Sequence, residues 1–313
     1  MTDLVCVGAA NVDLALHVDR FAKSDQEISV KRFYMGGGGS AANVAVGASR
    51  LGLSSGFLGN VGEDYFGDFL IREFENEGVD ITRLRRVKVR SGLAVCIVDV
   101  TGERIIYTYG EANAQFSESN IDEDYIRDAR VIYMSSLQGE KSFQTMVKVS
   151  EIASRSNIET FFDPGHIFIE KGLKALKRIL KNVTVVKFNR AEINSLTGLK
   201  DIRSSTEKIL GLGPQTVLTT LGGKGCHVAT KKVDCTIPTY QQFKPVDKTG
   251  AGDSFNAGFI AGHIRGMSLK DSVRFANLVA SISVSRFGAR STPTLSELRN
   301  LREFKEYEGK FHI

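Results

Sequence analysis

The segment from Val246 to Phe259 (VDKTGAGDSFNAGF) carries residue types that suit phosphoryl transfer. Gly250 and Gly252 have no Cβ, so a bound group can approach their backbone closely. A helix that begins near Ala251 would leave backbone N–H groups unpaired and directed at that group, which would make this turn an anion hole. Asp253 would stand in the first helical turn, where its carboxylate can accept a hydroxyl proton. An aspartate is also favoured there without any chemistry, and for GAGD alone that explanation is the stronger one.

A second glycine-rich stretch, Gly36–Gly39, runs into a helix that we expect to end at Gly52. Gly39 allows a ligand to lie against bare backbone, and Asn43 offers both a donor and an acceptor. A dinucleotide-binding loop is the competing interpretation, but no GxGxxG follows the first predicted strand. A flexible linker is another, although linkers do not usually run into an amphipathic helix. The stretch therefore predicts a second ligand-binding region.

Polar residues also follow the first predicted strand, Leu4–Gly8, whose apolar run indicates burial on both faces. Asn11 and Asp13 come directly after it. In open α/β sheets, ligands bind outside the carboxyl ends of the strands, which makes both side chains candidate ligand contacts. An ordinary Asx turn is about equally consistent with them.

Two further strand ends carry polar or glycine-rich residues. Asn189 and Glu192 follow the predicted strand 183–188 and are spaced to hold water ligands of Mg²⁺, or to form a helix capping box, which by itself is the stronger interpretation. The strand 216–220 leads into Leu221–Gly225, a glycine turn that could line the phosphates of a nucleotide or simply form a hairpin.

Beyond residue 120, predicted strands alternate with predicted helices, which indicates a parallel sheet with helices on both faces. Two earlier segments, about 14–34 and 92–113, alternate apolar and polar residues instead, and Thr101-Gly102-Glu103 in the second is a hairpin signal. We expect them to form a small antiparallel sheet inserted into the α/β body. Such a sheet needs its apolar face covered, so it would cap the site as a lid or pair with a second subunit.

Composition excludes several classes of protein. The chain has 313 residues, normal globular proportions and a net charge of +5 that is spread along the sequence, which argues against a nucleic-acid partner. No run approaches the ~20 apolar residues of a membrane span, and the N-terminus does not resemble a signal peptide. Three of the four cysteines fall in strand-like apolar runs, as expected of reduced thiols in a cytoplasmic protein. The five histidines lack zinc-ligand spacing, and no Walker phosphate loop occurs.

Together these features resemble the PfkB, or ribokinase-like, family of carbohydrate and nucleoside kinases, over nearly the whole chain. The N-terminal signature of that family resembles Gly38–Gly52, its C-terminal signature Asp247–Gly258, and its NxxE motif Asn189–Glu192. The resemblance implies that residues 1–313 form a single doubly wound α/β domain with a mostly parallel sheet. It also implies a β-sheet lid, which in that family often forms a dimer interface, so we expect a homodimer.

The resemblance implies roles for individual residues as well. Asp253 would deprotonate the acceptor hydroxyl, beside an anion hole formed by Gly250, Ala251 and Gly252. The predicted contacts to substrate hydroxyls are Asn11, Asp13, Gly39 and Asn43. The predicted nucleotide contacts are Thr220, Gly222, Gly225 and Asn277, the last near the adenine. Asn189 and Glu192 would organise Mg²⁺, through water, and the phosphates of ATP. Asp247, Thr249 and Ser291 match positions that bind a monovalent cation such as K⁺.

Three departures from the ribokinase pattern concern the site. The loop GGKGAN of ribokinase is GGSAAN here, without the lysine. A glutamate expected after the strand 131–134 is replaced by Leu137 or Gln138, and Phe188 stands where a proline usually precedes NxxE. The first two changes affect the sugar pocket, so ribose is not specified as the acceptor.

We therefore expect an ATP-dependent kinase that phosphorylates a hydroxyl of a small sugar. A nucleoside kinase is the first alternative, and an aromatic pocket near Phe33, Phe116 or Phe168 would favour it. A catalytically silent binding protein of the same fold is the second, since fold alone does not determine function. The intact GAGD and NxxE motifs argue against it.

Overall fold

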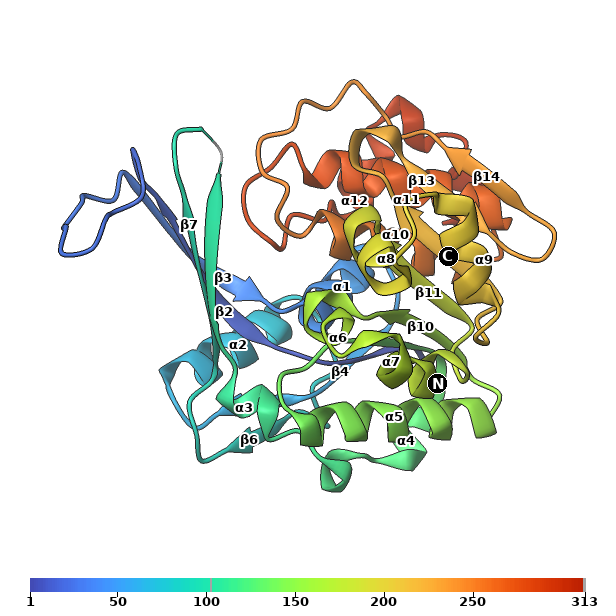
Figure 1. Cartoon of the computed structure of the whole chain (residues 1–313), viewed down its shortest axis with the longest axis horizontal. Helices are drawn as coiled ribbons and strands as arrows, with labels where there is room; N and C mark the ends of the chain where they lie inside the picture. The colour runs from blue at the N-terminus through green and yellow to red at the C-terminus, as the bar shows by residue number, and fades with distance from the viewer. Residues whose placement is uncertain (102, 312–313) are drawn as a thin grey trace.

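The computed structural model describes residues 1–101 and 103–311, and its centre is an eight-stranded sheet with the order β14-β13-β12-β11-β10-β9-β1-β4 (Figure 1). Strands β4, β1, β9, β10, β11 and β12 are parallel, whereas β13 and β14 are antiparallel additions at one edge. The strands of this sheet are β1 (Thr2–Val7), β4 (Ser55–Leu58), β9 (Ala129–Ser135), β10 (Glu159–Asp163), β11 (Val185–Asn189), β12 (Thr216–Thr220), β13 (Cys226–Ala229) and β14 (Asp234–Ile237).

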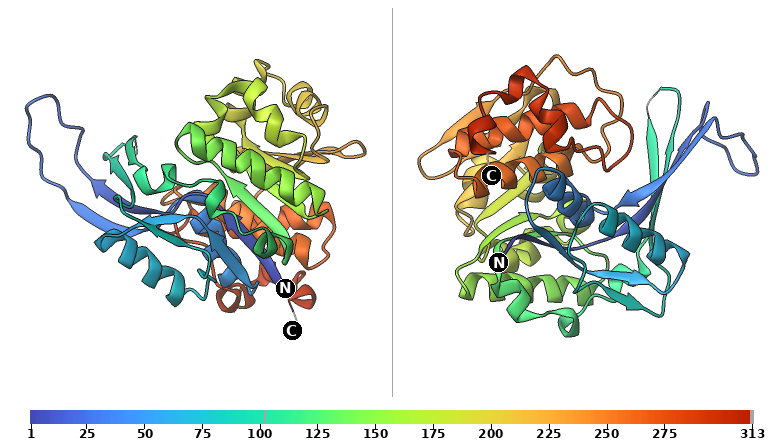
Figure 2. Two further views of the ribbon diagram at one scale, coloured as in Figure 1. Left: turned by 90° about the horizontal axis from the view of Figure 1, so that it is seen from below. Right: turned by 180° about the vertical axis from the view of Figure 1, so that it is seen from behind.

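Helices cover both faces of this sheet, as both views of Figure 2 show. Alternate residues of β1 supply the two cores, because successive side chains of a strand point to opposite faces: Leu4 and Cys6 join one hydrophobic cluster, and Val5 and Val7 join the other. The first cluster lies under α1 (Ser40–Arg50), α10 (Ala251–Ile264) and α11 (Leu269–Ser283). The helices packed on the second cluster are α4 (Glu123–Arg127), α5 (Glu140–Arg155), α6 (Gly165–Ile169), α7 (Gly172–Leu180), α8 (Arg190–Thr197) and α9 (Ile202–Leu210).

A separate four-stranded sheet, sheet B, projects from the body with the order β3-β2-β7-β8 (Figure 1). Helix α2 (Tyr65–Asn76) contacts its base, and a two-stranded sheet of β5 and β6 lies beside it. The strands are β2 (Asn11–His17), β3 (Arg32–Gly38), β7 (Gly92–Val98), β8 (Arg104–Tyr109), β5 (Asn60–Gly62) and β6 (Arg85–Val87). The remaining elements are α3 (Glu111–Ala114), α12 (Leu295–Arg299) and the 3₁₀ turns η1 (Glu118–Asn120), η2 (Gly222–Lys224), η3 (Arg302–Phe304) and η4 (Glu308–Lys310).

The predicted doubly wound α/β architecture with a separate small sheet is confirmed. Sheet B is mixed rather than purely antiparallel, because β2 and β7 come from distant parts of the chain and pair in parallel. Its strands span 11–17, 32–38, 92–98 and 104–109, so residues 111–114 of the predicted second segment form a short helix instead. The predicted turn at Thr101-Gly102-Glu103 includes residue 102, which lies outside the described residues.

Two local predictions were wrong. The sheet does not end near residue 34, because Gly36–Gly38 form the end of β3 and pair with Asn11–Asp13. Asn11 and Asp13 therefore lie in a strand rather than in a turn after β1. The stretch 56–61 is divided between β4 and β5, which lie in different sheets.

Helix α7 begins at Gly172, whose φ of 76° separates it from α6. Within the described part of the chain, no helix is both long enough and apolar enough to span a membrane.

Candidate active site

The turn before α10 has a conformation that requires glycine. Gly250 is the N-cap of α10 and has a φ of 75°. A Cβ built on it would lie 2.0 Å from the carbonyl oxygen of Ala289, so any other residue would displace the neighbouring chain. The helix begins at Ala251, as predicted, and Asp253 stands in its first turn. The N–H of Ala251 donates to the carbonyl of Lys248 at 3.3 Å, whereas those of Gly252 and Asp253 have no backbone partner within the described chain and are available to an anion.

The Asp253 carboxylate is held by α1, more than 200 residues away in the sequence. Ser40 donates a hydrogen bond to its Oδ1 at 2.7 Å, and the Asn43 amide donates to its Oδ2 at 2.8 Å. Both donors lie on the first turn of α1. This helix follows Gly39, which has a φ of 90° and leaves no room for a side chain, because a Cβ there would lie 2.4 Å from the carbonyl oxygen of Ala9. The structure thus brings together three predicted site residues, Gly39, Asn43 and Asp253.

The surroundings of Asp253 shift its protonation. The pKa of this carboxyl is raised to about 6, first by burial and then by the charge of Asp163. The hydrogen bonds from Asn43 and Ser40 and the charge of Lys187 act in the opposite direction. A general base operates best when its pKa is near the working pH, so the value suits proton transfer at neutral pH.

A buried ion pair lies behind the start of α10. Lys187, on β11, places its Nζ 2.9 Å from the Asp163 carboxylate at the end of β10. Burial lowers the pKa of Lys187, but the attraction of Asp163 and Glu192 outweighs burial and raises it, so the ammonium stays charged. A Cβ built on Gly252 would lie 3.1 Å from Nζ, which places a positive charge directly beside the predicted anion hole.

A short chain of hydrogen bonds joins this ion pair to Ser40. The Asn256 amide donates to Asp163 at 2.8 Å and to the Tyr133 hydroxyl at 3.1 Å, and that hydroxyl lies 3.1 Å from Ser40 Oγ. Its members come from α10, β9, β10 and α1. The carboxylate at 253 is therefore surrounded by groups whose orientation is fixed.

The predicted substrate contacts Asn11 and Asp13 lie side by side on one face of β2. Asn11 Oδ1 accepts a hydrogen bond from Asn113 at 2.7 Å. The Asp13 carboxylate packs against Gly38, where a Cβ would lie 2.1 Å from Oδ1. Burial raises the pKa of Asp13 to about 7; Arg290 lowers this pKa and Asp253 raises it, so Asp13 lies within electrostatic reach of the predicted base.

The predicted nucleotide contacts Thr220, Gly222, Gly225 and Asn277 all line one cavity of about 310 Å³. Asn277, on α11, donates hydrogen bonds to the carbonyls of Ile237 and Pro238 at 3.1 and 3.0 Å, which anchors that side of the cavity. Ala251 and Gly252 line the same cavity. The cavity therefore reaches the first turn of α10, next to Asp253.

Asn189 and Glu192 form the capping box that the spacing also allowed. Asn189 Oδ1 accepts from the N–H of Glu192 at 2.9 Å, and Glu192 Oε2 accepts from the N–H of Asn189 at 2.7 Å. Burial and the charge of Asp163 raise the pKa of Glu192, while Lys187 lowers it. Glu192 therefore lies close enough to the ion pair for both charges to affect its pKa. Its role toward Mg²⁺ stays a prediction.

The three residues predicted to hold a monovalent cation have separate hydrogen-bond partners. Asp247 accepts from the N–H groups of Thr249 and Gly288 at 2.8 and 3.0 Å. Ser291 is buried, and its hydroxyl lies 2.6 Å from that of Ser283. No hydrogen bond between described residues links Ser291 to Asp247, so the cation site also stays a prediction.

Sequence reasoning missed Ser40, Lys187 and Asp163. For Lys187 a signal existed: it is the one cation in the apolar run 185–188, and a lysine in a buried strand needs a charged partner. Ser40 was noted only because it replaces the lysine of the ribokinase loop. The hydrogen bond from Ser40 to Asp253 depends on packing between α1 and α10, and no local sequence pattern predicts such packing. Of the two residues considered in place of a glutamate, Leu137 is buried in the core and Gln138 reaches sheet B, where it donates to Thr108 at 3.0 Å.

Comparison with known proteins identifies the family. The model of the pfkB family of carbohydrate kinases matches residues 1–295. An uncharacterized sugar kinase from Archaeoglobus fulgidus is 34% identical over 245 residues, which are 78% of this chain and 97% of that protein. The crystal structure of ribokinase from Thermotoga maritima matches with a TM-score of 0.85 at 30% identity, covering 95% of this chain and 98% of that one. The structure of Arabidopsis thaliana ribokinase complexed with ribose and ATP matches with a TM-score of 0.82 at 26% identity, covering 94% and 96%. The chain therefore belongs to the pfkB family of carbohydrate kinases and has the ribokinase fold.

Proposed function

We propose that this protein transfers the γ-phosphoryl group of ATP to a hydroxyl of a small sugar, with Asp253 as the general base. The observation that carries the proposal is the position of that carboxylate. It is fixed by Ser40 and Asn43 on the side of sheet B, while Ala251 and Gly252 beside it line the cavity of about 310 Å³. A base between a nucleotide-sized cavity and a polar strand is the arrangement that transfer to a hydroxyl requires.

In the proposed reaction, the acceptor oxygen attacks the γ-phosphorus while its proton passes to Asp253. The bond between that phosphorus and the bridging oxygen breaks, and ADP leaves with the electron pair. The backbone N–H groups at the start of α10 and the Lys187 ammonium would stabilise the charge on the transferring group. Because these donors are already in place, little reorganisation is needed during the reaction.

Glu192 and Asn189 would hold Mg²⁺ through its water ligands. Carboxylate and amide oxygens suit this metal, which keeps much of its hydration shell near phosphates. The raised pKa of Glu192, caused by burial and by Asp163, is consistent with a carboxylate that a nearby cation would return to its ionised form. When bound, the metal would neutralise charge on the β- and γ-phosphates.

The acceptor side favours a polyhydroxylated substrate over a nucleoside. Asp13 and Thr108 both pair with Ala94, so the three side chains lie on the same face of sheet B. Gln138 contacts that face through its hydrogen bond to Thr108. The aromatic pocket that would favour a nucleoside is not formed by the expected residues: Phe116 and Phe168 are fully buried in the core. Phe33 is 62% exposed and pairs with Leu16, whose side chain points away from the Asp13 face, so Phe33 lies on the opposite face of sheet B.

That opposite face of sheet B supports the proposal of a homodimer. Leu16 pairs with Phe33 and Ile97, and Ile97 pairs with Ile105, so all of them share the face. Phe33 and Tyr107 are each 62% exposed there. A second copy would cover this apolar surface, while the other face serves as a lid over the acceptor.

We expect Phe33→Asp to convert the dimer into a monomer in light scattering, because each copy would then bury an unpaired carboxylate in the interface. Tyr65→Asp is the matched control, since Tyr65 is 65% exposed on α2, outside sheet B. A wild-type protein that is monomeric at micromolar concentration would contradict the dimer and leave the kinase proposal unaffected.

The decisive test of the function is ADP release measured with a coupled assay over pentoses, hexoses, ketoacids and nucleosides, with and without K⁺. We expect turnover with at least one sugar and none with nucleosides. Asp253→Asn should lower kcat by about 10²–10⁴-fold for the accepted sugar, because the base is lost. ATP binding, measured by calorimetry, should persist in this variant. Near wild-type turnover by Asp253→Asn would show that the proposed mechanism is wrong.

A further inference from the structure

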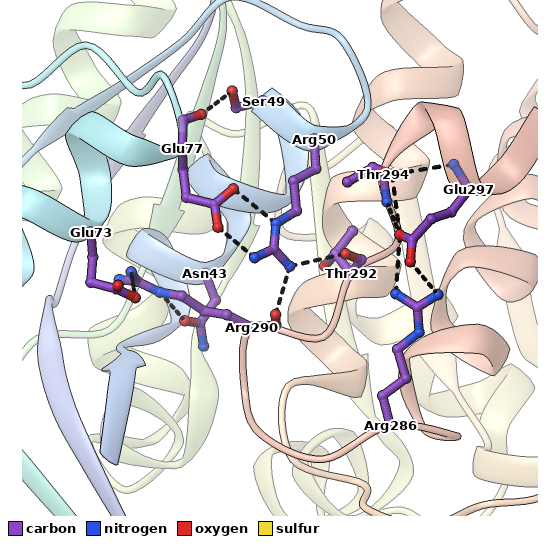
Figure 3. A network of polar contacts seen from close by, with 10 residues as sticks. All are labelled: Asn43, Ser49, Arg50, Glu73, Glu77, Arg286, Arg290, Thr292, Thr294 and Glu297. Carbon is purple, nitrogen blue, oxygen red and sulfur yellow. Dashed lines mark hydrogen bonds and ion pairs between the residues drawn. The ribbon is translucent and has the colours of Figure 1, made fainter. Parts of the chain in front are cut away.

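Arg290 occupies an unusual position at the root of sheet B. Its guanidinium is only 4% exposed and lies between β3, α1 and α2 (Figure 3). Gly37 of β3 leaves room for it, since a Cβ there would lie 2.2 Å from the central carbon of the guanidinium. The ring of Phe74 on α2 stands 5.2 Å away. The side chain thus fills the junction where the sheet that would cover the acceptor leaves the body.

Arg290 has one hydrogen-bond partner that leads directly to the catalytic carboxylate. Its Nε donates to Asn43 Oδ1 at 3.4 Å, and Asn43 Nδ2 donates to Asp253 Oδ2 at 2.8 Å. An amide has an acceptor end and a donor end. If the Asn43 amide turned over, its oxygen would face the Asp253 carboxylate and its NH₂ would face the guanidinium, and both contacts would be repulsive. Arg290 therefore selects the orientation in which Asn43 donates to Asp253.

The other two nitrogens of the guanidinium are buried and have no hydrogen-bond partner within the described chain. The nearest carboxylate oxygen, Glu73 Oε2, is 3.6 Å from Nη1. A buried donor without a partner is destabilising, and an apolar side chain beside Phe74 would avoid that cost. Stability alone therefore does not explain an arginine at this position.

The stabilising role in this region belongs to a different arginine. Arg50 pairs with Glu77, the C-cap of α2, and its Nη1 donates to the carbonyls of Arg290 and Thr292 at 2.6 and 3.1 Å (Figure 3). These bonds anchor the backbone at 290 to α1 without using the Arg290 side chain. The two arginines thus provide a natural comparison, one for anchoring and one for orientation.

We propose that Arg290 is a positioning residue for acceptor deprotonation, acting through the Asn43 amide on Asp253. The inference rests on the proposed function, because it assigns Asp253 as the base. Arg290 also stands close enough to Asp13 to lower the pKa of that carboxyl, so one guanidinium influences both carboxylates on the acceptor side. The nucleotide cavity does not include Arg290 among its lining residues.

The test is a double-mutant cycle between Arg290→Met and Asn43→Ala, measured with the accepted sugar. We expect Arg290→Met to lower kcat by about 10–100-fold, with the KM for ATP unchanged, because the base is misoriented while the donor cavity is intact. Arg290→Lys should recover part of kcat, since an ammonium can also donate to Asn43. The double variant should be no slower than Asn43→Ala alone, because both substitutions interrupt one chain of contacts.

Arg50→Met is the matched control. It should lower the melting temperature more than Arg290→Met does and leave kcat within about twofold, since it removes anchoring bonds only. Independent effects of the two substitutions in the cycle, or a kcat of Arg290→Met equal to wild type, would overturn the proposal.

If Arg290→Met does not fold, Arg290→Leu, which also cannot donate to Asn43, and the same cycle built on it decide the question. A urea-unfolding cycle of whichever of these two variants folds with Asn43→Ala tests the contact without any turnover. Wild-type protein that turns over no acceptor would refute the proposed function, whereas additive unfolding free energies would refute this inference alone.

Discussion

The two sides of the candidate site, the cavity proposed for the phosphate donor and the region around Asp253 and Asp13 proposed for the acceptor, are lined by different types of residue. The cavity that we propose for the nucleotide is lined by glycine, alanine, threonine and aromatic residues among others, with Lys248 as the one charged group among the lining residues described. On the acceptor side, Asp253, Asp13 and Arg290 lie close together, and burial raises the pKa values of both carboxyls, to about 6 and about 7. The donor side is therefore a shaped, largely neutral space, whereas the acceptor side is a cluster of buried charges.

This difference indicates how the two substrates would be recognised. A nucleotide can be bound by backbone groups and by cavity shape, which the fold supplies before the ligand arrives. An acceptor hydroxyl must be oriented and deprotonated, which requires charges held where water is scarce. Substitutions on the donor side should therefore alter KM for ATP, and substitutions on the acceptor side should alter kcat and its pH dependence.

After removal of the base at Asp253, the largest expected effect comes from Lys187, which lies at the boundary between the two sides. We expect Lys187→Met to lower kcat by about 10²–10³-fold, because it removes a positive charge beside the anion hole at Gly252. Steady-state kinetics with the accepted sugar measures this effect.

The same substitution leaves Asp163 buried without its ion-pair partner, at a cost of about 3–5 kcal/mol of stability. Adding Asp163→Asn should restore most of that stability and none of the turnover. If the double variant recovered kcat, Lys187 would be a structural residue and the boundary between the two sides would lie elsewhere.

The fold and the two glycine motifs could be predicted because they leave local signals. Apolar periodicity predicted many of the strands and helices, and Gly250 and Gly252 predicted the turn before α10. The glycines 36–38 were misassigned because glycine disfavours strands when considered locally. Here they extend β3, with Arg290 lying against Gly37 and Asp13 against Gly38.

The electrostatic part of the site could not be predicted in the same way. Ser40 and Asn43 lie at sequence separations of 213 and 210 from Asp253, and Arg290 lies 247 residues from Asn43. Such contacts arise only when α1, α10 and the C-terminal segment pack together. Composition and periodicity carry no information about which of many polar residues meet there.

The pH profile provides a second way to separate the two sides. We expect kcat/KM for the acceptor to rise with pH and to level off above about pH 6 to 7. The reason is that Asp253, with its pKa raised to about 6, must be ionised to accept a proton. Between pH 6 and pH 5 the loss should be about five- to sixfold, because the ionised fraction of a group with a pKa of about 6 falls by that factor.

Asp13→Asn sharpens this test, because the variant removes the second carboxyl, whose pKa is raised to about 7. Its acidic limb should stay near pH 6, because Asp13, with its pKa raised to about 7, is already largely protonated there, and only a contribution near pH 7 should disappear. ATP binding by calorimetry should change little over the same range. A flat acceptor profile from pH 5 to pH 8 would show that neither carboxylate limits the reaction.

The smallest expected effect lies on the donor side. Ala280 on α11 lines the nucleotide cavity, and Ala280→Leu would place a larger apolar side chain into a space of about 310 Å³. We expect KM for ATP to rise by roughly tenfold, with kcat and KM for the acceptor unchanged, because binding is lost equally in the ground and transition states. Lys270→Leu, exposed on the same helix, is the matched control. A loss of kcat without a change in KM for ATP would mean that this cavity communicates with Asp253 through α10, and that the two sides act as one unit.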